Sequence, residues 1–441
     1  MTQQDLIITP IYLLLFLIAA YLLRSNFSNS QTSNYFIPAL LFKFIGAIAL
    51  GLIYQFYYGG GDTFTFHTHG SHWIWEAFMD DPIVGFKLFT QEPGNYNGET
   101  YAYTSKIWMF KDRASMAIIK LAAAFDLLTF GTYSSTALFF AAFAFSGQWA
   151  VFSIFQKIYP DKTRWLAFSI LFVPSVVFWG SGILKDSITL AALCWMTFAL
   201  FRIFQTNNYS LANILILVFM AWVIYAIKIY ILLCFIVAAC FYLYIRYIST
   251  VKNTLVKLMI APILISLFLG GGYLALEEVA EDDSRYALDK IGETAMITAY
   301  DIRYGWGARH GDNSGYTLGE LDGSLGSLIR LAPSGIIVTL FRPWVWEVKN
   351  PLMLLAAMES LAFLLLTIWV LYKTPLKTLI KKLNSPVILF CLSFALMFAF
   401  AVGVSTYNFG TLMRYKIPVM PFYSVFLVLI FPSKSDQKAK K

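Results

Sequence analysis

The chain has 441 residues, of which 59% are apolar and only 13% are charged; soluble domains average about 45–50% and about 25%. A soluble protein of this composition would have too little polar surface to cover its core, which excludes a cytosolic enzyme, a disordered chain and a nucleic-acid-binding protein. The composition predicts a polytopic α-helical membrane protein, in which the net charge of +8 has to be interpreted by position.

Apolar runs long enough to cross a bilayer recur along the chain, and we expect an all-α fold with about eleven transmembrane helices. One straight helix over residues 211–247 would be about 55 Å long, too long for a single crossing. We therefore expect a turn at residues 225–228 that divides this run into two. The predicted spans are 7–23, 36–58, 133–155, 165–182, 187–204, 211–225, 229–247, 256–276, 352–371, 386–405 and 419–431.

Lys and Arg residues concentrate on alternate connections between these spans, and the positive-inside rule places that side in the cytoplasm. The tail, residues 432–441, is basic and belongs to this side, whereas residues 1–5 have no basic residue and are expected outside. The chain is therefore predicted to cross its membrane several times. The basic connections contain Arg24, Lys157, Lys162, Arg164, Arg202, Arg246, Lys252, Lys257, Lys373, Lys377, Lys381 and Lys382.

Two long segments, 59–131 and 277–351, are predicted to lie outside, and together they contain all four histidines. Neither has the composition of a linker, so we expect one integral membrane domain over residues 1–441. Both segments mix Trp and Tyr with charged residues, which is typical of helices that lie in the membrane interface. Interfacial helices are expected at 73–78, 114–130 and 336–346.

The first outer segment opens with three glycines followed by Asp62. Consecutive glycines allow a sharp turn and a close approach of the backbone to a ligand. A carboxylate at the membrane surface is partly desolvated and therefore more basic, which suits a general base that acts on a membrane-borne substrate. The alternative is a solvated capping aspartate in a turn at a helix end.

Three histidines, His67, His69 and His72, follow within ten residues of Asp62. Together with the aspartate they could bind zinc, although this spacing on a loop is weak evidence for a metal site. We expect no metal and no other cofactor. Either His67 or His69 hydrogen-bonds a substrate, or the rings contact lipid headgroups.

Lys185 and Asp186 lie at the outer turn between two strongly apolar runs. Charged residues in such a place need a neutralising partner. One interpretation is a mutual ion pair between Lys185 and Asp186 that joins two helices. The other assigns Lys185 to a substrate phosphate and Asp186 to the substrate.

Arg414 and Lys416 precede the last span on the predicted outer face, against the positive-inside trend. A phosphate group explains misplaced cations, because Arg binds phosphate oxygens through two nitrogens; snorkelling to ordinary lipid phosphate is the alternative. In the second outer segment, Arg342 and Glu347 flank two tryptophans. Aromatic rings beside charged groups suit a carbohydrate, so both residues are candidates for substrate binding.

The order and type of these motifs resemble the GT-C superfamily of integral membrane glycosyltransferases, which use polyprenyl-phosphate-linked sugars. The resemblance implies that Asp62 is the catalytic base and that Lys185 and Arg414, with Lys416 nearby, hold the donor phosphate. The chain departs from the family in that a single acid follows the second predicted span, where many members have two adjacent acids after the first. The motifs that carry the resemblance are Asp62 at the start of the outer loop, Ser181, Lys185 and Asp186 after Pro174, and Arg414, Tyr415, Pro418 and Pro421.

We therefore expect glycosyl transfer from a polyprenyl-phosphate sugar to a lipid, glycan or protein acceptor at the outer face of the bacterial inner membrane. Surrounding lipid is a further expected partner and nucleic acid is not. Two alternatives stay open at this point. One is an O-antigen-type polysaccharide polymerase or ligase, and the other is a lipid or polysaccharide transporter without covalent chemistry.

Overall fold

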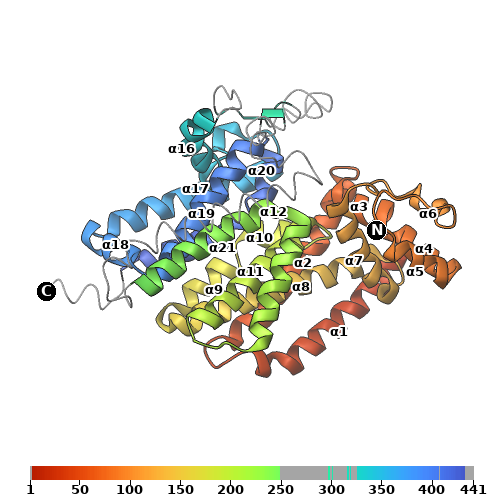
Figure 1. Ribbon diagram of the computed structural model, residues 1–441, viewed down its shortest axis with the longest axis horizontal. Coiled ribbons are helices and arrows are strands. Elements are labelled where there is room, and N and C mark those ends of the chain that lie inside the picture. The colour runs from red at the N-terminus through yellow and green to blue at the C-terminus, as the bar shows by residue number, and fades with distance from the viewer. Residues whose placement is uncertain are drawn as a thin grey trace. The chain divides into compact units, whose positions relative to one another are not determined.

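The computed structural model describes residues 2–248, 296–297, 300, 315–316, 318, 325–406 and 408–432. Over these residues the fold consists of helices and turns without a strand (Figure 1). The chain divides into two compact units, Met1–Ile229 (unit 1) and Tyr230–Lys441 (unit 2), which are described separately. The expectation of one domain over residues 1–441 stays a prediction.

Seven helices in the described part of the chain are long and apolar enough to cross a membrane, or eight if a bent pair of short helices counts as one span. The protein is therefore an all-α polytopic membrane protein, as the composition predicts. The bent pair is α20 (Phe409–Tyr415) with α21 (Val419–Ile430), at 64° to each other. The seven are α1 (Gln3–Phe27), α2 (Ser33–Phe56), α8 (Tyr133–Ile158), α11 (Lys185–Phe204), α12 (Leu211–Ile248), α17 (Pro351–Lys373) and α19 (Pro386–Thr406).

The span predicted at 165–182 is not one helix. It forms α9 (Thr163–Leu171) and α10 (Pro174–Trp179), with Val173 extended at φ −65° and ψ 121°. Proline lacks a backbone N–H and disfavours the helical conformation at the preceding residue, which explains the break. Proline suits the first turn of a new helix, and α10 begins there.

The other predicted spans have different outcomes. The run 211–247 forms α12, which consists of two helices joined at a kink, because Lys228 is non-helical at φ −149° and ψ 79°. This break lies within the predicted turn. The run 419–431 is shorter than a full span, with 12 helical residues in α21, and 256–276 lies outside the described residues.

Unit 1 is built around α8, which packs against α1, α2, α9 and α11. The contact with α11 is close because Gly147 has no side chain: a Cβ there would lie 2.5 Å from the carbonyl oxygen of Ala191. Small residues at such positions let helix backbones approach one another in a membrane.

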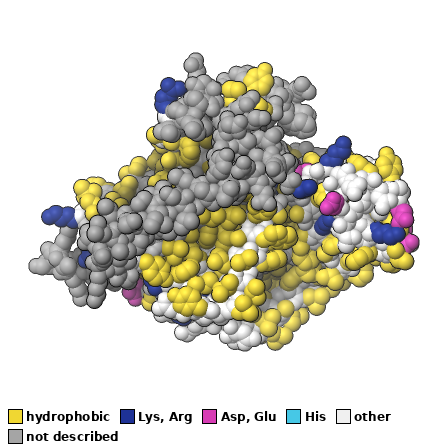
Figure 2. Space-filling model, viewed as in Figure 1, with side chains coloured by type: hydrophobic (Ala, Val, Ile, Leu, Met, Phe, Trp, Pro, Cys, Tyr) yellow, Lys and Arg dark blue, Asp and Glu magenta, His cyan; other side chains and the backbone are white. Residues whose placement is uncertain are grey.

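Six short helices connect α2 to α8, and they include the predicted helices at 73–78 and 114–130 as α4 and α7. Figure 2 shows charged side chains gathered over the region of α4 to α6, beside membrane helices that present mainly apolar side chains. We call the segment 80–112 in this region the polar lobe. The helices are α3 (Asp62–Phe66), the π-helix η1 (His67–Ser71), α4 (His72–Asp80), α5 (Pro82–Thr90), α6 (Tyr101–Thr104) and α7 (Arg113–Thr129).

In unit 2, α16 (Leu325–Phe341) packs on α19, and α19 packs on α21. A Cβ at Gly403 would lie 2.1 Å from the carbonyl oxygen of Gly335, so α16 and α19 touch through two glycines. Thr339 donates a hydrogen bond across the same contact to the carbonyl of Ala399, at 2.7 Å. The helix predicted at 336–346 is divided between the end of α16 and the 3-10 turn η5 (Val345–Glu347).

Candidate functional site

Asp62 is the first residue of α3 and is half-buried. The three glycines before it have φ values of 69°, 141° and 126°, which L side chains rarely adopt. A Cβ on Gly61 would also lie 2.6 Å from the ring of Tyr54. The sharp turn predicted here is therefore present, and it places the carboxylate of Asp62 shortly after the end of α2.

The helix that begins at Asp62 is held against the first turn of α8. The hydroxyls of Thr63 and Tyr133 share a hydrogen bond of 2.7 Å, and the ring of Phe64 stacks on Tyr133 at 4.5 Å between centroids. Both contacts involve buried or half-buried groups next to Asp62. They fix the backbone of α3, and hence the Cα of Asp62, to a membrane helix.

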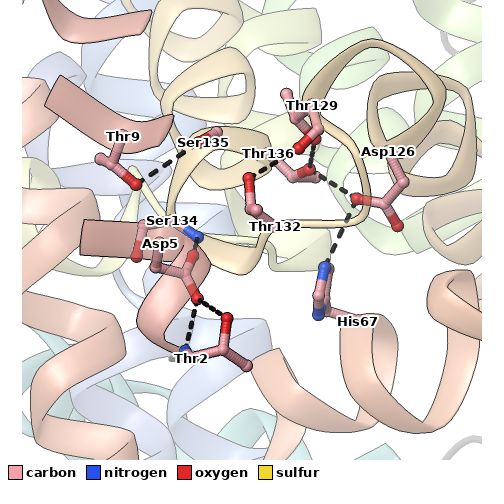
Figure 3. A network of polar contacts seen from close by, with 10 residues as sticks. All are labelled: Thr2, Asp5, Thr9, His67, Asp126, Thr129, Thr132, Ser134, Ser135 and Thr136. Carbon is pink, nitrogen blue, oxygen red and sulfur yellow. Dashed lines mark hydrogen bonds and ion pairs between the residues drawn. The ribbon is translucent and has the colours of Figure 1, made fainter. Parts of the chain in front are cut away.

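His67 faces Asp126 of α7 in the interior of unit 1 (Figure 3). His67 Nε2 lies 3.4 Å from Asp126 Oδ1, and the two residues are 4% and 0% exposed. Thr136 also donates a hydrogen bond to Asp126 Oδ1. A buried carboxylate needs a proton, a cation or hydrogen-bond donors to offset its desolvation, and a histidine can supply the first two.

A second buried acid, Asp5 of α1, supports the same end of α8. Asp5 Oδ1 accepts the backbone N–H of Ser134 at 2.7 Å, and Oδ2 accepts that of Thr2 at 2.6 Å. Negative charge is favourable at a helix N-terminus. Figure 3 shows that Asp5 and Asp126 approach the first two turns of α8 from two different helices.

The three histidines of the cluster have different neighbours. The ring of His69 stacks on Trp108 at 3.7 Å and 6°, and that of His72 stacks on Trp75 at 5.3 Å and 29°. Burial lowers the pKa of both rings, and His67 contributes at His72, so both imidazoles are mainly neutral at pH 7. Among the residues that the structure describes, no group of three His, Cys, Asp or Glu side chains is arranged to hold a metal ion.

Lys185 and Asp186 are adjacent but have different partners. Lys185 Nζ lies 2.9 Å from Asp112 Oδ2, and Asp112 also caps α7 by accepting the N–H of Ser115. Burial alone would raise the pKa of the Asp112 carboxyl, but the hydrogen bonds from Ser115 and Lys185 outweigh burial and hold it below its ordinary value. Lys185 therefore joins α11 to the polar lobe.

Asp186 pairs with Lys228, the residue at which α12 breaks. Both side chains are buried. The predicted neutralising partners thus exist, but the alternative in which Lys185 and Asp186 neutralise each other does not hold. Removal of one partner from such a pair leaves the other charge buried and uncompensated, which is strongly destabilising.

In unit 2, Arg342 and Glu347 form a two-pronged ion pair. The guanidinium lies over the rings of Tyr316 and Phe409, at 5.4 and 5.2 Å from their centroids. Glu347 also accepts the backbone N–H of Trp344 at 2.8 Å. The two predicted residues are therefore in contact, and aromatic rings pack against the guanidinium.

Lys416 is 1% exposed and donates a hydrogen bond of 3.0 Å to the hydroxyl of Ser360. Ser360 in turn donates to the backbone carbonyl of Arg342 at 3.0 Å. Arg414, two residues earlier, is half-buried and lies over the ring of Tyr415. Three unit 2 candidates, Arg342, Glu347 and Lys416, are thus linked through Ser360 of α17, and Arg414 lies two residues before Lys416, in α20.

One buried cation was missed by the sequence interpretation. Lys43 of α2 is buried and donates hydrogen bonds to the carbonyls of Val176 and Gly180, at 3.0 and 2.8 Å. These carbonyls end α10, just before the turn that leads to Lys185. A single lysine inside an apolar run was the signal that could have identified it.

The candidates fall into two groups, one in each unit. Unit 1 contains Asp62, His67, His69, Lys185 and Asp186, and unit 2 contains Arg342, Glu347, Arg414 and Lys416. Comparison with known proteins finds no matching family model, no matching curated protein and no matching solved structure.

Proposed function

We propose that this protein is a membrane glycosyltransferase that moves a sugar from a polyprenyl-phosphate donor to an acceptor hydroxyl at the outer face of the bacterial inner membrane. The observation that carries the proposal is the half-buried Asp62, which follows a turn of three glycines at the end of α2. A carboxylate fixed at the end of a membrane helix can reach both a lipid-linked substrate and water.

In the proposed reaction, Asp62 accepts the proton of the acceptor hydroxyl. The acceptor oxygen forms a bond to the anomeric carbon of the sugar, and the bond from that carbon to the phosphate oxygen breaks. Polyprenyl phosphate leaves with the bonding electron pair, so no oxidant or reductant is involved. Direct attack inverts the configuration at the anomeric carbon.

The donor phosphate is assigned to the cations of the outer face. Arg414 offers a guanidinium that matches phosphate geometry, and the buried Lys416 adds positive charge beside it. Lys185 is a third candidate, and a phosphate there would compete with Asp112 for its ammonium group. Cations placed at the leaving oxygens stabilise the charge that develops there.

The assay that tests this function uses the purified protein in nanodiscs with synthetic polyprenyl-phosphate sugars and a set of lipid, glycan and peptide acceptors. We expect sugar transfer in the wild type and its near loss in Asp62→Asn. Asp161→Asn is the matched control, because that aspartate is exposed on a predicted cytoplasmic connection. A ladder of products instead of one addition would favour the polymerase, and substrate movement without a new bond would favour the transporter.

The orientation can be tested separately by labelling single cysteines from outside intact cells. We expect a reagent that does not cross the membrane to modify Asn95→Cys in the polar lobe but not Lys377→Cys in α18 (Leu376–Leu383). Both wild-type side chains are exposed, so access rather than burial decides the result. The reverse pattern would overturn the outside assignment of Asp62.

A further inference from the structure

Trp108 is an exposed aromatic ring that is held in one position. It is 66% exposed, yet one face of the indole is covered by His69, which is parallel to it at 3.7 Å. The backbone N–H of Trp108 also donates to the carbonyl of His69, at 3.1 Å. Ring and backbone are thus both fixed to η1, which continues the helix that begins at Asp62.

The loop on either side of Trp108 is anchored in the interior. Ile107 is 3% exposed and Phe110 is 1% exposed, while Trp108 between them points outward. The carbonyl of Phe110 accepts the N–H of Gly94 at 2.9 Å, which ties the loop to its own beginning. A ring presented in this way loses little freedom when a ligand stacks on it.

Polar groups lie on the same short segment. Lys106 Nζ lies 4.0 Å above the ring of Trp73, and the hydroxyl of Tyr103 donates to Asp80 at 2.6 Å. The hydrogen bond to Asp80 raises the pKa of Tyr103 to about 12, so the phenol stays protonated at neutral pH. Rigid aromatic rings with charged and hydroxyl groups beside them are the chemistry that recognises sugars.

We propose that the free face of Trp108 binds a sugar ring of a glycan acceptor. This inference rests on the proposed function and narrows its acceptor from lipid, glycan or protein to a glycan. Asp62 and His69 are seven residues apart on the consecutive helices α3 and η1, which kink at His69 (φ −101°, ψ 18°). Seven residues of helical rise correspond to roughly 10 Å. A short oligosaccharide spans that length, with one ring on Trp108 and its terminal hydroxyl near Asp62.

The charge of the surroundings favours a glycan over membrane lipid as the occupant. Figure 2 shows charged side chains over the region of α4 to α6, and α5 in this region also exposes Ile83 and Phe86. Exposed charges in this lobe include Lys87 and Glu99, which pair with each other.

The test measures binding, not turnover. Soluble oligosaccharides of three to six sugars, in glucose, mannose, galactose and N-acetylglucosamine series, are titrated onto the protein in nanodiscs, with saturation-transfer NMR as the readout. We expect at least one series to bind, Trp108→Ala to weaken it about tenfold, and Trp108→Phe to retain part of the affinity. Trp165→Ala, an equally exposed tryptophan of α9 on the predicted cytoplasmic side, should leave binding unchanged.

Three results would overturn the inference: no binding in any series, equal binding by wild type and Trp108→Ala, or equal losses in Trp108→Ala and Trp165→Ala. Brominated lipids provide a second measurement that does not depend on a folded alanine variant. If they quench wild-type fluorescence more than that of Trp108→Phe, Trp108 lies in the bilayer and the inference fails. Glycan binding that depends on Trp108 without any sugar transfer would instead refute the proposed function alone.

Discussion

The two units bury different kinds of charge. Unit 1 buries three carboxylates, Asp5, Asp126 and Asp186, together with two lysines, whereas the described residues of unit 2 bury Lys416 and no acid. A buried carboxylate requires a proton or donors, and a buried ammonium requires an anion or acceptors. The proposed function assigns the proton acceptor to unit 1 and the donor phosphate to unit 2, which is compatible with this difference.

The compensation of these charges differs as well. In unit 1, Asp186 meets a lysine, Asp5 meets backbone N–H groups and Asp126 meets a histidine and a threonine. In unit 2, Lys416 donates a hydrogen bond to the neutral hydroxyl of Ser360, and the carboxylate of Glu359 interacts with it electrostatically. A ligand phosphate at Lys416 would therefore share this cation with Glu359.

The proton-handling assignment of unit 1 is tested most severely at Asp62. Asp62→Asn keeps the size of the side chain but removes its ability to accept a proton. We expect turnover to fall by about 10²–10⁴-fold, the usual contribution of a general base, with donor binding close to wild type. The measurement is kcat for sugar transfer together with donor affinity. Full activity of the variant would move the base to another outer acid such as Glu347.

The next largest effect is expected on the free energy of unfolding, at the Asp186–Lys228 ion pair where α12 breaks. Asp186→Asn leaves the buried Lys228 without its counter-charge, which should cost about 3–5 kcal/mol of unfolding free energy. The double variant Asp186→Leu with Lys228→Met removes both charges and should recover most of this loss. Unfolding in mixed micelles measures both. A single variant as stable as wild type would show that water reaches Lys228.

The anion-handling assignment of unit 2 predicts a smaller effect on binding. Arg414→Ala should weaken donor binding about tenfold to a hundredfold, because a hydrogen bond to a charged phosphate is lost. Arg414→Lys should restore only part, since an ammonium cannot form the two-pronged contact. Affinity for a polyprenol without phosphate is the control and should be the same in all three proteins. Equal losses of affinity for both ligands would show that Arg414 does not bind the donor phosphate.

The smallest effect concerns the ion pair between α11 and the polar lobe. Because the pKa of Asp112 is lowered on folding, the pair contributes stability above the ordinary carboxyl value of 3.8 and loses it as the pH falls through the folded value. Asp112 is 41% exposed, so screening limits this contribution to a few tenths of a kcal/mol. Asp112→Asn should flatten the acid limb of the stability curve below pH 3.8. An unchanged acid limb would show that other carboxyl groups cause the loss of stability at low pH.

Apolar runs were sufficient to predict most membrane helices, because length and hydropathy are properties of one segment. The glycines before Asp62 likewise predicted the turn that the backbone makes there. Pro174 was noted in the sequence, yet its effect was underestimated: a run with continuous hydropathy can still be two helices. Such a break leaves backbone carbonyls without donors in their own helix. Whether a neighbouring helix supplies donors cannot be predicted from the hydropathy of one segment.

Partners of charged residues could not be predicted for the same reason. Asp112 and Lys185 are separated by 73 residues, and Asp186 and Lys228 by 42. The residues adjacent in sequence suggested one ion pair where folding makes two. Asp126 lies in the predicted interfacial helix 114–130 and was not among the candidate site residues, although it is buried beside His67.

The lysine in α2 has a consequence for how the chain enters the membrane. At the end of α10 the carbonyl of Val176 accepts the backbone N–H of Gly180, and lipid supplies no further donors. Lys43, made more than 130 residues earlier, provides a second hydrogen bond to Val176 and one to the carbonyl of Gly180. The broken helix is therefore expected to be retained at the translocon until α2 is beside it, and α2 acts as a template for a later part of its own chain.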